Sequence, residues 1–271
     1  MLRFLRAHYV TAAWLEIKIL AKPLAADKQS VMQTTEPVIV EGISNQEFLE
    51  RFARPGCVGL SGGVTLVDKA ICRAERHLDD QQRWGIWSHA FIFQGRRPDG
   101  HHWVIESDLQ FHKKHIQLGV QENRITKYFN EENYTTLAVL DFGLTDAETN
   151  AIIAEGLEMV ATRTKYSLRE LIGTLIALRR PELRGEENVL ARERSVYCSA
   201  FVRHLFQSAG VDLAPGVKGK NTTPQDISLS VVPHTTYLLQ RKVATSSLKS
   251  LREKVSHQVK ARVRLLKRKS R

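Results

Sequence analysis

Two patterns of apolar residues along the chain predict that strands and helices are mixed. An apolar run with aromatic and β-branched residues covers 90–93 and ends at Gln94-Gly95, which is typical of a buried strand. A second such run covers 102–106, after the turn residues 97–100, so we expect an antiparallel hairpin. A further strand is predicted at 137–142.

Helical spacing and capping signals predict helices around these strands. Helices are expected over 45–52, 67–78 and 168–179, the last of which stops at Pro181. Another helix should begin at the capping box Thr145-Asp146-Ala147-Glu148. A further helix should run from Cys198 to Ala209 and end at Gly210. The residues between the elements are expected as loops, including a glycine-rich turn at 61–63 and a charged surface loop at 180–195.

Cys198 is the first candidate for chemistry, because it begins a predicted helix. Unpaired backbone N–H groups and the positive end of the helix dipole favour a thiolate at that position, and a thiolate is the nucleophilic form. A buried structural cysteine is the alternative for a single cysteine on an apolar helix. The choice depends on the partners of Cys198.

His89 and Glu106 are the candidate partners. A thiolate nucleophile needs an imidazole to exchange its proton, and the imidazole needs an acceptor on its other nitrogen. His89 begins the first strand of the hairpin and Glu106 lies in the second, so cross-strand neighbours can bring them together. Taken singly, His89 could be a core histidine and Glu106 a solvated charge.

Composition indicates a globular protein with one sizeable core. The chain has 271 residues, of which 42% are apolar and 25% charged, and its apolar stretches fall far short of the ~20 residues of a membrane span. The three cysteines form no disulfide framework. Glu16 and Lys18 interrupt the N-terminal apolar segment, which therefore indicates an amphipathic helix rather than a signal peptide.

The basic excess of the chain lies at its C-terminal end. Residues 241–271 contain 12 Lys and Arg against one acidic residue, whereas residues 1–240 contain 28 of each. Apolar residues in this tail recur every three or four positions, which is typical of one face of a helix. This helix could lie on an anionic membrane surface or pack on the core. Nucleic acid is the weaker expectation as a partner, because the tail offers no aromatic residue for stacking. We expect an N-terminal helix and linker at 1–45, a core domain at 46–240 and this tail.

A metal site is not expected, although histidines are frequent near Glu106. His101, His102, His112 and His115 could supply ligands. However, the chain has no HExxH or paired CxxC motif, and the neighbouring Lys113 and Lys114 would repel a cation. We therefore expect neither a metal nor another cofactor.

The order histidine, acid, cysteine resembles the circularly permuted NlpC/p60-type papain-like hydrolases, also called YiiX-like. The resemblance covers about residues 50–230 and departs from the family at Cys57, where the family usually has Asp. Its motifs are short, and their order carries the resemblance. They are Pro55-Gly56-Cys57, Ser88-His89-Ala90, Val104-Ile105-Glu106-Ser107, Gly119-Val120, Lys165-Tyr166-Ser167, Cys198-Ser199-Ala200-Phe201-Val202 and Thr223-Pro224-Gln225-Asp226.

The resemblance implies an α+β fold with a permuted papain-like core, in which an antiparallel sheet packs on the helix that carries the nucleophile. It also implies a Cys198-His89-Glu106 triad, with Tyr166 and Ser199 supporting the site and the backbone N–H of Cys198 holding the oxyanion. We expect helical extensions at both ends of this core.

The function expected from these features is a cysteine hydrolase that cleaves an acyl bond. The first substrate candidate is a peptide or amide bond of the bacterial cell wall (peptidoglycan), and the alternative is an acyl bond of a phospholipid at a membrane surface. A binding or scaffold protein with the same fold is the second alternative. Peripheral membrane association and export by a dedicated system both stay open.

Overall fold

A computed structural model of the chain describes residues 36–78, 81, 83–111, 116–165, 168–188, 196–239 and 241. The predicted N-terminal helix and the basic tail from residue 242 onward lie outside these ranges. The helices in the described ranges are α1 (Asn45–Phe52), α2 (Leu66–Glu75), α3 (Asp146–Ala161), α4 (Leu168–Ala177), α5 (Cys198–Ser208) and α6 (Pro224–Ser228), with short 3-10 turns η1 (Arg76–Leu78), η2 (Ile125–Phe129), η3 (Pro181–Leu183) and η4 (Gly219–Asn221).

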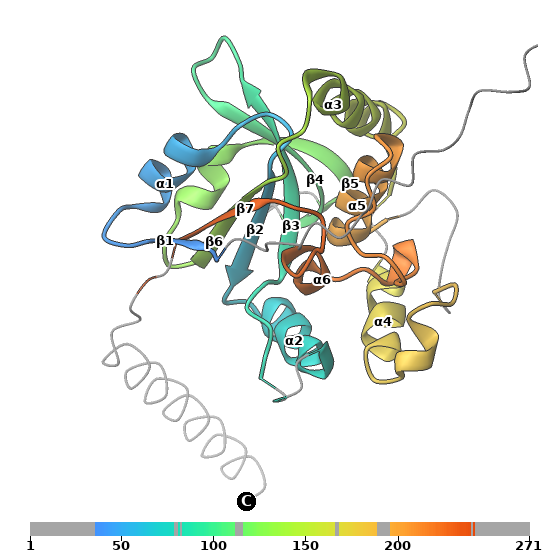
Figure 1. Cartoon of the computed structure of the whole chain (residues 1–271). Helices are drawn as coiled ribbons and strands as arrows, with labels where there is room; N and C mark the ends of the chain where they lie inside the picture. The colour runs from blue at the N-terminus through green and yellow to red at the C-terminus, as the bar shows by residue number, and fades with distance from the viewer. Residues whose placement is uncertain are drawn as a thin grey trace, which may run out of the picture. The chain divides into compact units, whose positions relative to one another are not determined.

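Within the described ranges, seven strands form one sheet in the order β1-β7-β6-β2-β3-β4-β5 (Figure 1). β1 pairs with β7 in parallel, and the other neighbouring pairs are antiparallel. The strands are β1 (Val38–Val40), β2 (Val58–Gly63), β3 (His89–Arg96), β4 (His102–Phe111), β5 (Ile116–Arg124), β6 (Tyr134–Asp141) and β7 (Thr235–Leu239).

The two faces of the sheet bury separate cores. Alternate side chains of the central strands, such as Ile92 and Ile105, pack with α5 and α3 in one core. Their neighbours Phe91 and Val104 pack with α1 and η2 in the other core. Figure 1 accordingly shows α1 on one side of the sheet and α3 and α5 on the other. The alternation follows from the two-residue period of a strand, and it gives the α+β architecture that the pattern predicts.

The predicted hairpin and helices are confirmed. β3 and β4 pair antiparallel, with Ile92 opposite Ile105. The capping box at the start of α3 is present, with Thr145 and Glu148 bonded to each other's backbone N–H groups. Gly210 ends the segment after α5 in the left-handed region, at φ 79°. The permuted papain-like arrangement of these elements stays a prediction.

The glycine-rich turn expected at 61–63 is wrong, because these residues end the central strand β2. Neither glycine has space for a Cβ atom, because Gly62 lies against the carbonyl oxygen of Ile86 and Gly63 against the carboxylate of Asp68. Close approach by neighbouring groups, rather than chain reversal, accounts for the glycines here.

Two segments expected as linker or loop contain ordered contacts. Val38–Val40 lies inside the expected linker and forms β1, because its β-branched residues complete the edge beside β7. In the segment expected as a surface loop, Arg184 contacts both carboxylate oxygens of Asp226 at 2.6 Å, and Asn188 is buried. Both cases depend on partners distant in sequence.

No helix within the described residues is long and apolar enough to cross a membrane.

Candidate functional site

Cys198 is the first residue of α5 and is 3% exposed. The preceding residue, Tyr197, is extended at φ −102° and ψ 173°, and no side chain of the described residues caps the helix there. The first backbone N–H groups of α5 are therefore not taken up by a capping side chain. Such groups favour negative charge at the helix start.

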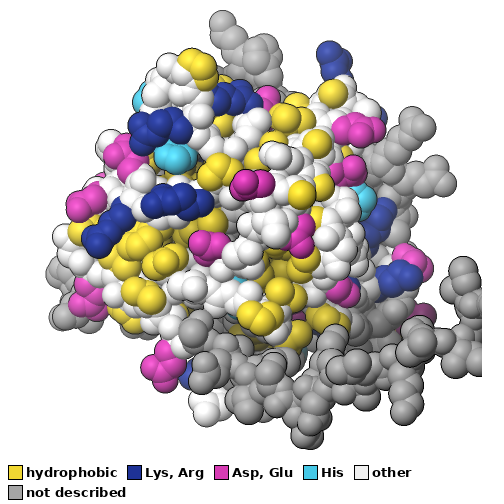
Figure 2. All heavy atoms as spheres, turned by 45° about the horizontal axis from the view of Figure 1, so that its top comes forward, with side chains coloured by type: hydrophobic (Ala, Val, Ile, Leu, Met, Phe, Trp, Pro, Cys, Tyr) yellow, Lys and Arg dark blue, Asp and Glu magenta, His cyan; other side chains and the backbone are white. Residues whose placement is uncertain are grey.

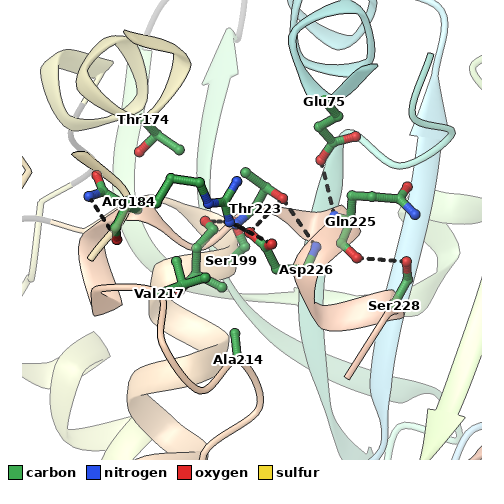
Figure 3. A network of polar contacts seen from close by, with 12 residues as sticks. Glu75, Thr174, Arg184, Ser199, Ala214, Val217, Thr223, Gln225, Asp226 and Ser228 are labelled. Carbon is green, nitrogen blue, oxygen red and sulfur yellow. Dashed lines mark hydrogen bonds and ion pairs between the residues drawn. The ribbon is translucent and has the colours of Figure 1, made fainter. Parts of the chain in front are cut away.

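The residues on both sides of Cys198 are anchored to one carbonyl. The hydroxyl of Tyr197 donates to the backbone oxygen of Thr222 at 2.5 Å, and the hydroxyl of Ser199 donates to the same oxygen at 2.8 Å. Thr174 of α4 donates to the Tyr197 hydroxyl at 2.9 Å. Figure 3 labels Ser199 and Thr174 in a close view of this region. We call these contacts the Thr222 clamp, and they hold the backbone on each side of the sulfur.

Ser107 of β4 fixes the chain just before the helix. Its hydroxyl donates to the backbone oxygen of Val196 at 2.7 Å, and the Val196 N–H donates to the backbone oxygen of Lys165 at 2.9 Å. Ser107 is fully buried. The strand that carries Glu106 thus also positions the segment that leads into Cys198.

His89 contacts both Glu106 and Cys198. Its Nε2 lies 2.6 Å from Oε2 of Glu106, which leaves Nδ1 for the hydrogen bond with the Cys198 thiol. Burial disfavours the charged imidazole, but the charge of Cys198 and the hydrogen bonds with Cys198 and Glu106 outweigh it and raise the pKa of His89 to about 10. These contacts therefore favour the protonated form of His89.

Glu106 is completely buried and has partners on both carboxylate oxygens. Oε2 accepts from Tyr128 at 2.6 Å as well as contacting His89, and Oε1 accepts from Asn123 at 2.7 Å and Lys127 at 2.8 Å. Burial alone would raise the pKa of Glu106, but the charge of Lys127 and the hydrogen bond with His89 hold it well below the ordinary value. The carboxylate is therefore ionised and rigidly held.

The site also has the composition of a cation site. Among the described residues, His89, Glu106 and Asp108 could place ligand atoms within 4.8 Å of one another. Lys127 already supplies positive charge there, because its ammonium group contacts Glu106 at 2.8 Å and Asp108 at 2.5 Å. A metal ion that bridged the two carboxylates would have to displace this lysine. His101 and His102 are not in the group, and His112 and His115 lie outside the described residues.

Glu75, at the end of α2, is a second buried acid that interacts electrostatically with Cys198. Its Oε1 accepts the backbone N–H of Gln225 at 3.0 Å, as Figure 3 shows, whereas its Oε2 has no hydrogen-bond partner among the described residues. Burial raises the pKa of Glu75 well above its ordinary value, and the charges of Asp226 and Cys198 raise it further. The protonated form of this carboxyl group is therefore favoured by its surroundings, and the group lies within electrostatic range of the sulfur.

The other two cysteines are also free, but they lie in environments that disfavour a thiolate. Burial raises the pKa of the Cys57 thiol to about 12, and Asp141 adds to the effect. Burial likewise raises the pKa of Cys72 to about 12, with a further contribution from Glu75. No histidine of the described residues is among the groups that shift the pKa of either thiol most strongly.

The predicted site residues are brought together in part. His89 contacts Glu106 and has a hydrogen bond with Cys198, and the catalytic roles of these three residues stay predictions. Ser199 donates its hydroxyl to the Thr222 backbone and so supports the helix start. Tyr166 lies outside the described residues, so its expected role near the oxyanion stays a prediction.

Sequence reasoning missed the residues that hold Glu106 and the carbonyl that anchors the nucleophile. Asn123, Lys127 and Tyr128 come from β5 and the turn η2 that follows it, and Thr222 precedes α6. Lys127 and Tyr128 are adjacent and follow a strand, which is only a weak sequence indication that they contact Glu106. Nothing local to the sequence indicates that the Thr222 carbonyl accepts two hydrogen bonds.

Comparisons with known proteins show a distant structural likeness. No protein-family model matches the chain, and no curated protein matches it. Among solved structures, the chain is similar to the crystal structure of the metalloprotein yiiX from Escherichia coli O157:H7, at 15% identity and a TM-score of 0.43. The match covers 68% of this chain and 96% of that chain.

Proposed function

We propose that the chain is a cysteine hydrolase in which Cys198 is the nucleophile, His89 the general base and acid, and Glu106 the residue that orients His89. The observation that carries the proposal is the position of His89 between a helix-start thiol and a buried carboxylate. This is the arrangement of nucleophile, base and orienting acid from which covalent acyl transfer is built.

In the proposed reaction, the Cys198 sulfur attacks the carbonyl carbon of an amide or ester. The bond to the leaving group breaks as the His89 imidazolium protonates that group, leaving an acyl thioester on Cys198. His89, now neutral, takes a proton from water, the resulting hydroxide attacks the thioester, and the carboxylic acid leaves as the sulfur is released. Glu106 stays ionised throughout and keeps Nε2 of His89 engaged.

The developing oxyanion needs donors at the nucleophile. The backbone N–H of Cys198 is the donor we propose, because it lies at an uncapped helix start. The Thr222 clamp supports this role by fixing Tyr197 and Ser199 on either side of that N–H. Tyr166 is a further proposed donor from the sequence.

For the substrate, a peptide or amide bond of the cell wall is the first candidate, from the motif resemblance alone. A lipid acyl bond is the second candidate, and it is favoured by the exposed apolar residues on α2 and α4 that are described below. If the chain is instead a non-catalytic scaffold with the same fold, Cys198 is not expected to be more reactive than the other thiols.

The first test is selective alkylation of the intact protein with iodoacetamide at pH 7, followed by peptide mass mapping. We expect Cys198 to be labelled before Cys57 and Cys72, which serve as internal controls with raised pKa values. His89→Ala should slow labelling of Cys198 alone. Equal slow labelling of all three thiols would contradict the nucleophile and favour the scaffold.

The second test separates the substrate classes. The protein and a Cys198→Ala control are incubated in parallel with muropeptides and with phospholipid vesicles, and the products are analysed by mass spectrometry. Release of an amine from muropeptides assigns an amidase or peptidase, and release of fatty acid assigns a lipid acyl hydrolase. Product formation that is equal in both proteins would refute the thiol mechanism.

A further inference from the structure

Helices α2 and α4 leave a groove of about 580 Å³ between them, and its apolar lining is unusually exposed. Leu66 is 85% exposed and Trp84 is 54% exposed, and Ile172 and Ile176 of α4 are exposed as well. Large apolar side chains gathered at one place on a surface indicate an interaction site, whereas single ones do not. We call this set of residues the α2/α4 groove.

Every charged residue that lines the α2/α4 groove is basic. Lys69, Arg73, Arg76 and Arg179 line it, and none of the described lining residues is acidic. Among the described residues, three nearby acids are already engaged, because Asp68 is held in the capping box of α2, and Glu75 and Glu170 are buried. By contrast, Lys, Arg, Asp and Glu are interspersed on the face in Figure 2. The groove therefore combines an apolar floor with a positive rim.

The α2/α4 groove lies at the end of the sheet that carries the candidate active site. α2 follows the end of β2, and the chain then returns to begin β3 at His89. α4 contributes Thr174, which donates to Tyr197 beside the nucleophile. α2 and α4 contact each other, and both lie near this end in Figure 1.

The charge of the groove decides between possible occupants. Residues 241–271 are strongly basic, and residues 1–33 contain five Lys and Arg against two acidic residues, so either end of the chain would be repelled. A nucleic acid would require stacking platforms, and Trp84 is the one aromatic residue of the lining. An anionic lipid surface satisfies both features, since apolar side chains enter the acyl region while Lys and Arg reach the headgroups.

We propose that the α2/α4 groove docks the folded unit on anionic lipid. Leu66, Ile172 and Ile176 enter the boundary of the acyl chains, and Trp84 lies at the headgroup level, where indole rings are favoured. Arg73, whose guanidinium lies 6.0 Å from the Trp84 ring centroid, contacts phosphate groups beside it. The residues of this surface belong to α2, α4 and the segments beside them, and the proposal does not depend on the thiol chemistry.

The test is co-sedimentation of the full chain with vesicles of phosphatidylcholine alone and of phosphatidylcholine with phosphatidylglycerol. The variant Lys69→Glu/Arg73→Glu reverses two exposed charges of the groove. Its matched control is Arg51→Glu/Arg96→Glu, which makes the same change in net charge at exposed residues on α1 and β3. We expect the groove variant to lose about tenfold or more in affinity for the anionic vesicles, and the control to lose far less.

Trp84 supplies a second readout. Its fluorescence should shift to shorter wavelength on anionic vesicles, and Trp84→Phe should remove that part of the shift. Equal binding by the groove variant and the control, or a Trp84 signal that vesicles leave unchanged, would overturn the proposal. Loss of binding to a poly-glutamate peptide without loss of binding to vesicles would also overturn it and assign the groove to an acidic protein. Failure of the hydrolase would leave all these readouts unaffected.

Discussion

Glu106 and Ser107, adjacent in β4, hold opposite halves of the candidate site. Glu106 contacts Nε2 of His89 on one face of the strand, and the Ser107 hydroxyl donates to the backbone of Val196, just before Cys198, on the other. Successive side chains of a strand point to opposite faces. These two adjacent residues therefore fix the position of His89 relative to the segment that leads into Cys198.

Replacing the nucleophile should remove activity without unfolding the protein. Cys198→Ala deletes one sulfur atom from a buried position, so we expect little loss of stability and a loss of turnover by several orders of magnitude. Turnover and thermal unfolding are measured on the same preparation. Turnover close to that of the unmodified protein would exclude covalent catalysis by Cys198.

Glu106→Gln should reduce both stability and turnover. The substitution removes a buried charge that pairs with Lys127 and contacts His89, so unfolding should become easier by about 3 kcal/mol and turnover should fall roughly 10²–10⁴-fold. Asp108→Asn is the matched control, because Asp108 also pairs with Lys127 but is partly exposed. We expect the control to cost about 1 kcal/mol or less. Similar effects of the two substitutions would contradict the special role of Glu106.

Loss of the Thr222 clamp should affect catalysis but not substrate binding. Ser199→Ala removes one of the two hydroxyls that hold the backbone beside Cys198, and Tyr197→Phe removes the other. Each variant should lower kcat while leaving KM nearly unchanged, because a clamp acts on the position of the sulfur rather than on the substrate. A variant that changes KM alone would indicate substrate contact instead.

Glu75 predicts a dependence of stability on pH. Its folded pKa is raised by burial, so the native state binds the proton more tightly than the unfolded chain does. Between the ordinary pKa of about 4.5 and the raised value, stability should fall as pH rises. Glu75→Gln keeps an acceptor for the Gln225 N–H and cannot ionise. Urea unfolding at pH 5 and pH 8 should show that the variant loses less stability than the unmodified protein over this interval, and equal losses would refute the assignment.

Removal of residues 242–271 should weaken binding to anionic vesicles and leave the folded unit intact. This deletion retains Arg241, which pairs with Glu131, and removes most of the net positive charge. Binding of both the full and the shortened chain should decline with salt, as the Debye length falls below about 10 Å. Co-sedimentation at low and high salt measures this, and equal binding of the two chains at low salt would indicate a structural tail.

Local signals in the sequence predicted the helices, the hairpin and the residues with reactive potential. Apolar periodicity and capping boxes marked the hairpin and the helices, because these signals act between residues close in the chain. The helix-start thiol at Cys198 and the cross-strand pair of His89 and Glu106 were predicted for the same reason. Predicting them requires only one helix start and one hairpin, both of which are local features of the sequence.

Contacts between segments that are distant in sequence were evident only in the folded structure. Gly62 and Gly63 were mistaken for a turn, because the groups packed against them, the Ile86 carbonyl and the Asp68 carboxylate, lie outside the strand. The contacts of Lys127 and Tyr128 with Glu106, of the Thr222 carbonyl with α5, and of Glu75 with α6 all cross the fold. A hydrogen bond between distant segments leaves no periodic trace in a sequence, since only the packing of the sheet against its helices brings the two groups together.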